Sequence, residues 1–225
     1  ASTLLAAVVL QTAFHYETVV GHSSEGRHSL SFSSLIAKEC IFYSLIAGLF
    51  SMGNGIVNSF LVLLGESSKI AQISLFFSVN AIVLFVLRLL VGKVIDRANL
   101  LFIVNLSLLA GAGSMILIGK SGILVPILIA AAIKAFGNVG GQISLQSACV
   151  KRVDAARIGV ATSTYYIGAD IGQGLGPIWG GKVAEQFGYE GVFFCMAGFF
   201  LLGVICFTAY QLHLNRKTAS ETVIQ

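Results

Sequence analysis

Residues 122–149 read GILVPILIAAAIKAFGNVGGQISLQSAC, and this stretch decides the class of the fold. It is long and apolar, and Lys134 is its single charged residue. A bilayer core about 30 Å thick needs about 20 apolar residues of helix, so the stretch predicts a membrane-spanning helix. Its strongly polar side chains, Lys134, Asn138, Gln142 and Gln146, recur every four residues and therefore share one face of that helix.

The composition of the whole chain also indicates a membrane protein. Of its 225 residues, 56% are hydrophobic and 11% are charged, against roughly 25% charged residues in soluble domains. So few charges cannot coat a soluble particle, and the abundance of apolar residues excludes a disordered chain. The 14 Lys and Arg residues form no basic stripe, so we expect no nucleic-acid partner.

Six segments in all are long and apolar enough to cross a bilayer. Backbone polar groups in lipid must pair within their own segment, and runs of this length exceed barrel strands, so we predict helices. The predicted fold is an all-α integral membrane protein with a six-helix transmembrane bundle at 39–212. The predicted spans are about 40–64, 70–91, 99–119, 122–149, 158–181 and 190–211.

Positive charges are distributed unevenly over the two ends of these spans, which predicts an orientation. If the segment before residue 40 is cytoplasmic, ten Lys and Arg residues lie on the cytoplasmic side and three on the other side. We therefore expect a multi-pass protein of the cell membrane, surrounded by lipid, with both ends of the bundle in the cytoplasm. The cytoplasmic set is Arg27, Lys38, Arg88, Lys93, Arg97, Lys151, Arg152, Arg157, Arg216 and Lys217, and the other set is Lys69, Lys120 and Lys182.

The segments on either side of the bundle differ in character. Residues 1–14 are apolar but too short to cross a membrane, and no positive charge precedes them as in a signal peptide. We expect them to be the end of a preceding transmembrane helix, which would make the chain a fragment. Residues 15–38 are predicted to form a cytoplasmic central loop, and residues 213–225 a cytoplasmic tail.

Polar residues at helical spacing inside a span mark a face that contacts other helices or a wet cavity. Such faces occur in four of the spans, whereas the spans at 99–119 and 190–211 are mainly apolar. We predict that the polar faces line a pathway for a small-molecule substrate or for protons. The candidate residues are Asn54, Asn58, Lys134, Asn138, Gln142, Tyr166, Asp170 and Gln173.

Two of these candidates, Lys134 and Asp170, are charged and lie near the middle of neighbouring spans. An ionised side chain at this depth costs about 2.5–3.5 kcal/mol on insertion scales, so it indicates a function. The two groups fit a structural ion pair, and they equally fit a proton or substrate site in which protonation of Asp170 releases Lys134. The sequence leaves both interpretations open.

Glycines recur every four residues in the span at 158–181. Gly168, Gly172, Gly176 and Gly180 share one face, where a second helix can approach closely, and Pro177 removes one helical hydrogen bond. This pattern fits tight helix packing alone, and it also fits a helix whose bend helps to open and close a pathway.

The end of the second span reads RLLVGKVIDR over residues 88–97. Arg88, Gly92 and Asp96 are spaced by four and share one helical face at the cytoplasmic boundary. Together with Arg97, this pattern resembles the short cytoplasmic loop signature of the major facilitator superfamily of secondary transporters. The resemblance implies that these four residues form a gating loop.

The resemblance covers about residues 35–215 and implies a specific architecture. Members of the superfamily have twelve helices in two halves, each half made of two inverted three-helix repeats, and they hold the substrate between the halves. The six spans resemble the second, C-terminal half, which implies that the N-terminal six-helix half is a missing partner. The segment at 172–181 is similar to the glycine and proline pattern of antiporters, which favours efflux.

The first functional hypothesis is therefore a secondary active transporter that exports small molecules by proton-coupled alternating access. A solute uptake symporter of the same fold and a structural six-helix membrane subunit are the alternatives. An intramembrane enzyme is disfavoured, because the four His residues lie outside the spans and the four Cys residues are far apart. No nucleotide-binding loop occurs in the sequence, and we expect no cofactor and no metal.

Overall fold

The computed structural model describes residues 36–95 and 99–223, all within the compact unit Ser33–Gln225. The predicted end of a preceding helix at 1–14 lies outside the described residues, as do residues 15–35 of the predicted central loop. Asp96 and Arg97 of the predicted gating loop also lie outside them. All regular structure in the described part of the chain is helical, which confirms the all-α prediction there.

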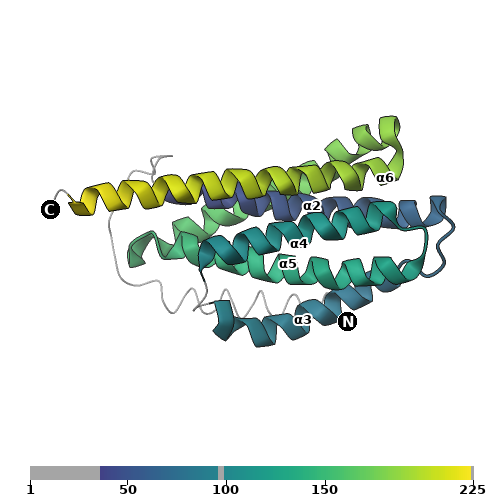
Figure 1. Cartoon of the computed structure of the whole chain (residues 1–225), viewed down its shortest axis with the longest axis horizontal. Coiled ribbons are helices and arrows are strands. Elements are labelled where there is room, and N and C mark those ends of the chain that lie inside the picture. The colour runs from purple at the N-terminus through teal and green to yellow at the C-terminus, as the bar shows by residue number, and fades with distance from the viewer. Residues whose placement is uncertain (1–35, 96–98, 224–225) are drawn as a thin grey trace, which may run out of the picture. The chain divides into compact units, whose positions relative to one another are not determined.

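Five α-helical elements and two short 3-10 helices make up the described chain. They are η2 (Lys38–Cys40), α2 (Ile41–Ser67), α3 (Leu75–Ile95), α4 (Leu100–Lys120), α5 (Leu124–Val150), η3 (Ala155–Arg157) and α6 (Ile158–Val223). The long element α6 is broken at Gly188, whose φ of 71° and ψ of 177° are not helical. It therefore consists of a first stretch, 158–187, and a second stretch, 189–223, which turn back on each other (Figure 1).

The observed helices differ from the predicted spans at two places. The helix expected from residue 70 begins at Leu75, because Lys69 and Gln72 take left-handed conformations with φ of 53° and 59° and interrupt the helix. The span expected to end at residue 181 continues to Gly188. The loop expected between the last two spans is thus replaced by helix with a break at one glycine.

Four described helical ranges are long and apolar enough to cross a membrane. These ranges are Lys38–Ser67, Leu100–Lys120, Leu124–Val150 and Ala155–Leu214, the last being 60 residues long and containing the break. The apolar part of α3, Leu75–Leu90, falls short of the length that a straight crossing requires. The number of crossings therefore stays a prediction, which is two crossings for α6 and six for the whole bundle.

Local sequence explains where two of the helices begin. At the start of α4, the side-chain oxygen of Asn99 accepts a hydrogen bond of 3.0 Å from the backbone N–H of Leu101. This cap satisfies an N–H group that has no partner within the helix. Pro126 lies in the first turn of α5, where its missing N–H costs no helical hydrogen bond.

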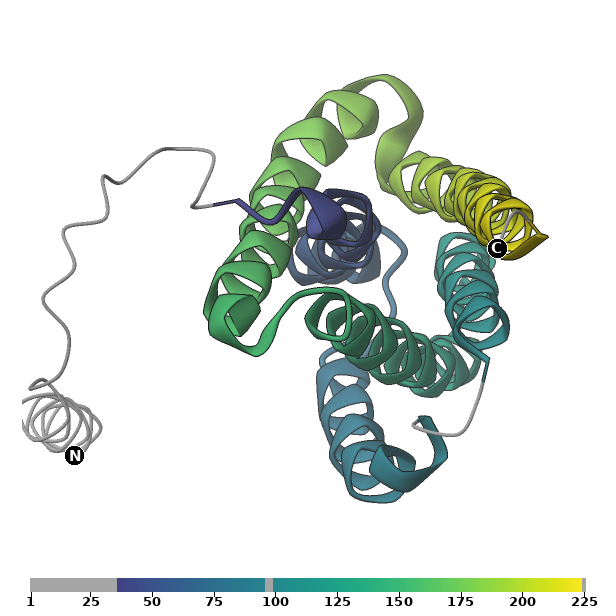
Figure 2. The ribbon, with the colours of Figure 1, turned by 90° about the vertical axis from the view of Figure 1, so that its left-hand side faces the viewer.

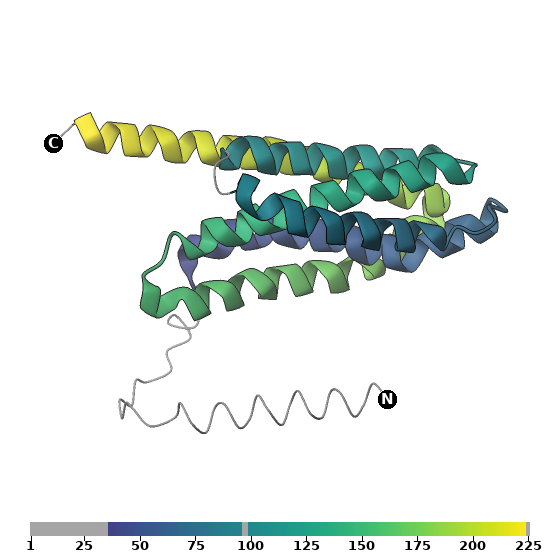
Figure 3. The ribbon, with the colours of Figure 1, turned by 90° about the horizontal axis from the view of Figure 1, so that it is seen from below.

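Helix α2 lies at the centre of the unit (Figure 2). It packs along α6, while α4 packs against α5 and α6, and α3 packs against α5. The helices run lengthwise beside one another (Figure 3). Large apolar side chains of α3, including Ile82, Phe85 and Leu89, are between 64% and 71% exposed, which is the surface expected of a helix in contact with lipid.

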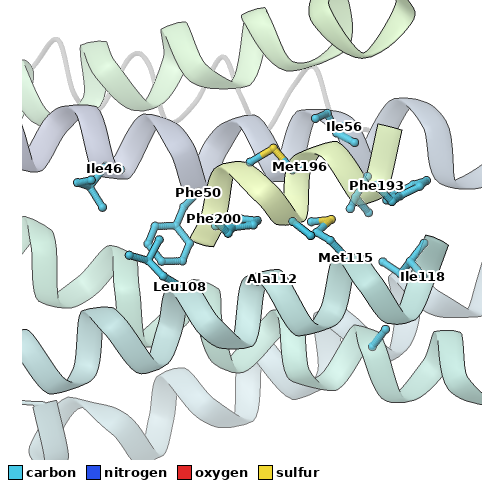
Figure 4. Close-up of a cluster of buried hydrophobic side chains, with 14 of the residues drawn as sticks. Ile46, Phe50, Ile56, Leu108, Ala112, Met115, Ile118, Phe193, Met196 and Phe200 are labelled. Atoms are coloured by element: carbon cyan, nitrogen blue, oxygen red, sulfur yellow. The ribbon is translucent and has the colours of Figure 1, made fainter. Parts of the chain in front are cut away.

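A cluster of buried apolar side chains joins α2, α4 and the second stretch of α6 (Figure 4). The ring of Phe200 lies 5.6 Å from the ring of Phe50, measured between centroids. Gly53 of α2 and Gly111 of α4 make room for Phe200. A Cβ atom would lie 2.9 Å from the ring of Phe200 if it were added to Gly53, and 3.1 Å from it if it were added to Gly111. Small residues therefore allow these helices to pack closely around one aromatic side chain.

The glycine face of the first stretch of α6 lies against α2. Gly168 is opposite Ser44, Gly172 opposite Gly48, Gly176 opposite Met52 and Gly180 opposite Phe60. The hydroxyl of Ser44 donates a hydrogen bond of 2.6 Å to the backbone oxygen of Thr164, which fixes the register of the two helices. This contact holds α2 and the first stretch of α6 together.

Candidate functional site

A cavity of about 500 Å³ opens between α2, α3, α5 and the first stretch of α6. Most of the side chains around it are polar or charged, although the outer surface of the unit is rich in exposed apolar residues. Its walls are made by Ser51, Asn54, Arg88, Gln142, Ile143, Gln146, Tyr165, Tyr166, Ala169, Asp170 and Gln173. Polar groups that are far apart in the sequence are thus brought to one hollow.

Five of the predicted pathway residues line this cavity, namely Asn54, Gln142, Tyr166, Asp170 and Gln173. Two others, Lys134 and Asn138, lie behind the wall and bond to Asn54. The remaining one, Asn58, has an exposed side chain and does not line the cavity. One helical turn along α2 therefore separates a polar residue that faces the hollow from one that does not.

Asn54 is the centre of a small hydrogen-bond network between α2 and α5. Its side-chain oxygen, Oδ1, accepts hydrogen bonds from Lys134 Nζ and from Asn138 Nδ2, the latter at 2.8 Å. Lys134 is 6% exposed. Lys134 and Asn138 are one turn apart on α5, so both can reach the same oxygen.

The sequence allowed an ion pair between Lys134 and Asp170. In the structure, the partner of Lys134 is Asn54. The ammonium group bonds to an amide oxygen of α2, whereas Asp170 is exposed on the cavity wall formed by α6. The two charged groups therefore have different surroundings, since Lys134 is buried and Asp170 is exposed.

Two tyrosines tie α5 to α6 along another part of the wall. The hydroxyl of Tyr165 donates a hydrogen bond of 3.0 Å to the backbone oxygen of Gln142, and Gln146 Nε2 donates one of 3.3 Å to the hydroxyl of Tyr166. The two rings meet edge to face, with centroids 5.4 Å apart. These contacts join α5 to the first stretch of α6 along the cavity wall.

Arg88 and Tyr165 also line the cavity, although neither is among the predicted pathway residues. The resemblance implies a place for Arg88 in the gating loop, but Arg88 lies in α3, two turns before the last described residue of that helix, Ile95, and it lines the cavity. At 1.5 Å per residue, this puts Arg88 about 10 Å inside the helix end. The span predicted from the sequence ends at about residue 91, three residues after Arg88, so the longer helix in the structure is what separates Arg88 from the loop.

The match to a known family covers most of the chain. The sequence profile of the Major Facilitator Superfamily matches residues 29–222. The chain belongs to the major facilitator superfamily. Comparisons with curated proteins and with solved structures gave no significant match. Membership identifies the chain as a multi-pass membrane transporter of this superfamily, as the loop signature and the apolar helices indicated.

Only part of the superfamily's loop signature falls on described residues. Arg88 and Gly92 lie in α3, with Arg88 exposed on the cavity wall. Among the described residues of the signature, Arg88 thus lines the cavity and Gly92 lies one turn further along α3. No group of three or more His, Cys, Asp or Glu side chains that could hold a metal ion occurs among residues 36–95 and 99–223.

Proposed function

We propose that the chain is the C-terminal six-helix half of a twelve-helix transporter, and that the complete protein exports small molecules in exchange for protons. The observation that carries this proposal is the polar cavity, which four helical elements line inside a unit with an apolar surface. The substrate would bind between this cavity and an N-terminal half, each half consisting of two inverted three-helix repeats.

In this proposal the pathway residues have distinct tasks. Asn54, Gln142, Tyr166 and Gln173 would bind polar groups of the substrate by hydrogen bonds from several elements, while Lys134 and Asn138 hold Asn54 in place. Their spread over α2, α5 and α6 would make binding depend on how these helices are arranged. A movement that changes the arrangement would release the substrate.

Asp170 is the carboxylate that we propose to couple transport to protons. It lies on the cavity wall and is exposed, so it can exchange a proton with water whenever the cavity is open. Ionisable groups inside membrane-spanning helices are the usual carriers of proton coupling. Alternating access would then expose the same carboxylate to each side of the membrane in turn.

Closure of the cytoplasmic side is assigned in this proposal to the connection after α3. Gly92, Asp96 and Arg97 would contribute to that closure, and Arg88 would belong to the cavity instead. Arg88 of the cavity and Gly92 of the closure lie one turn apart on α3, so a shift of this helix would affect both.

Transport by the full-length gene product in liposomes tests the proposal. A proton gradient directed into the liposomes should drive labelled solute outward if the protein is an exchanger, and inward if it is an uptake symporter. Dissipating the gradient with a protonophore should remove the accumulation in either case. If no solute in a broad panel moves under any gradient, the transport proposal fails and the structural-subunit alternative gains support.

A further inference from the structure

Lys134 is a buried cation without an opposite charge as its partner among the described residues. Its side chain is 6% exposed, and its ammonium group is bonded to the neutral oxygen of Asn54. No carboxylate contacts Lys134 among the described residues. Burying a charge is costly unless an opposite charge or hydrogen bonds compensate for it, and a single amide compensates only in part.

The same contact fixes the orientation of Asn54. A lysine ammonium group can only donate hydrogen bonds, and the amide group of Asn138 also donates to Asn54, so Asn54 must turn its oxygen towards both. The other end of the carboxamide, Nδ2, has no protein partner among the described residues. Because Asn54 lines the cavity, this N–H₂ group is available to a molecule bound there.

The charge of Lys134 also strengthens that donor. A cation bonded to the oxygen of an amide polarises the group and makes its N–H bonds better donors, most of all where the dielectric is low. Through Asn54, the positive charge of the buried Lys134 therefore affects the electrostatic potential at the cavity surface. A ligand with negative charge would gain from it, and a cation would be repelled.

Arg88 adds a second donor to the cavity from α3. Its guanidinium group belongs to the cavity wall and is exposed, and arginine binds carboxylates through two parallel hydrogen bonds. The charged groups at the cavity are two cations, Arg88 and Lys134, and one carboxylate, that of Asp170. Arg88 and Asp170 lie on the wall itself, and Lys134 behind the wall gives the site as a whole one positive charge in excess.

We propose that this cavity binds a small organic anion through a carboxylate group, with Arg88 and Asn54 Nδ2 as donors and Lys134 as the buried counter-charge. The inference rests on the transport function proposed above and names the class of its substrate. The cavity volume of about 500 Å³ limits the ligand to a small metabolite on this side of the site.

Matched pairs of ligands provide the first test on the purified full-length protein. We would measure the unfolding temperature with lactate and lactamide, and with succinate and succinamide, each at several millimolar concentrations. A ligand that binds the folded state raises this temperature, so the carboxylates should stabilise the protein and their amides should not. Equal effects within each pair, stabilisation by the amides alone, or no effect of any of the four would overturn the proposal.

Substitutions provide the second test. Arg88→Gln should raise the carboxylate dissociation constant by about tenfold or more, because it removes a charge-assisted hydrogen bond. Lys182→Gln removes an equal charge from an exposed position outside the cavity wall and should leave that constant unchanged. Equal dissociation constants for the Arg88→Gln variant and the wild type would exclude Arg88 as a donor.

Asn54→Asp separates a binding role from a structural role. The new carboxylate would give Lys134 the opposite charge it lacks, so the ligand-free protein should unfold at a higher temperature. The same change removes the Nδ2 donor and places a negative charge at the cavity, so stabilisation by lactate and succinate should disappear. If carboxylate binding survives this substitution, the inference is wrong.

The proposed function and this inference can fail separately. Counterflow of labelled succinate in liposomes without a proton gradient would support the substrate class even if no proton coupling is found. Proton-driven movement of uncharged solutes, with no counterflow of carboxylates, would keep the transporter and exclude the anion site.

Discussion

Gly48 of α2 and Gly172 of α6 lie backbone to backbone where the two helices cross. A Cβ atom on Gly172 would overlap the carbonyl oxygen of Gly48, whereas a Cβ atom on Gly174, in the same helix, would meet no atom within 4 Å beyond its neighbours in the chain and the backbone of its own helix. Helices in lipid gain little from apolar side chains, so close backbone contact of this kind is a main source of their association. Of the two interpretations of the glycine pattern, this contact favours tight packing.

We therefore expect Gly172→Ala to destabilise the protein and Gly174→Ala not to. The first substitution forces α2 and α6 apart, and overpacking of this kind costs about 1–3 kcal/mol. The second adds a methyl group in open space and gains helix propensity worth up to about 1 kcal/mol. Unfolding temperatures of the two variants in the same detergent give the comparison. Similar shifts for both variants would mean that the contact between Gly48 and Gly172 contributes little.

The break at Gly188 predicts that α6 crosses the membrane twice. The first stretch, 158–187, is about 45 Å long at 1.5 Å per residue, which exceeds the hydrocarbon core. Single cysteines introduced by Asp154→Cys and Gln186→Cys into a cysteine-free protein should therefore face opposite sides. A membrane-impermeant maleimide should label Asp154→Cys from the cytoplasmic side and Gln186→Cys from the other side. Labelling of both from one side would exclude the predicted topology.

The course of the helices could be predicted from the sequence because each long apolar segment must satisfy its own backbone in lipid. That requirement makes helix type and approximate length a local property, and the observed helices lie over the predicted ranges. The start of α3 could not be predicted. Lys69 and Gln72 adopt positive φ without being glycine, which hydropathy does not signal. The charges after residue 181 favour a loop by hydropathy, whereas the helix continues to Gly188.

The cavity could be predicted as a set of polar helix faces but not as a set of contacts. Spacing alone placed Asn54, Lys134 and Asp170 among the polar candidates. Which of them meet depends on the crossing positions of α2, α5 and α6, and these are set by packing over the whole unit. Hence the partner of Lys134, Asn54, and the exposed position of Asn58 required three-dimensional information.

Replacement of Asp170 tests the proposed proton coupling. Asp170→Asn keeps the size of the side chain but removes the group that would bind and release the proton. We expect proton-driven efflux to be lost, with exchange of labelled for unlabelled substrate retained at zero gradient. Flux measured over a range of external pH should become flat in the variant and stay dependent on pH in the wild type.

The matched control for this experiment is Glu185→Gln. Glu185 is an exposed carboxylate of the same stretch of α6 and does not line the cavity. Its replacement changes the net charge by the same amount and should leave flux and its pH dependence unaltered. Unchanged flux and pH dependence in the Asp170→Asn protein would show that the coupling group lies elsewhere.

The contact between Lys134 and Asn54 should appear as a coupling energy between two substitutions. Asn54→Leu leaves the buried ammonium group of Lys134 without its partner, and Lys134→Met removes one of the two donors to Asn54. Each substitution should therefore destabilise the protein, and the double variant should lose less than their sum. We expect the difference to be about 1 kcal/mol, within the range measured for hydrogen bonds between membrane helices. Unfolding free energies from denaturant titration of the four proteins provide the value.

The control cycle pairs Lys134→Met with Asn58→Leu. Asn58 lies one turn further along α2 with an exposed side chain, so the effects of these two substitutions should be additive. Additivity in both cycles would mean that the bond from Lys134 to Asn54 does not stabilise the arrangement of α2 and α5.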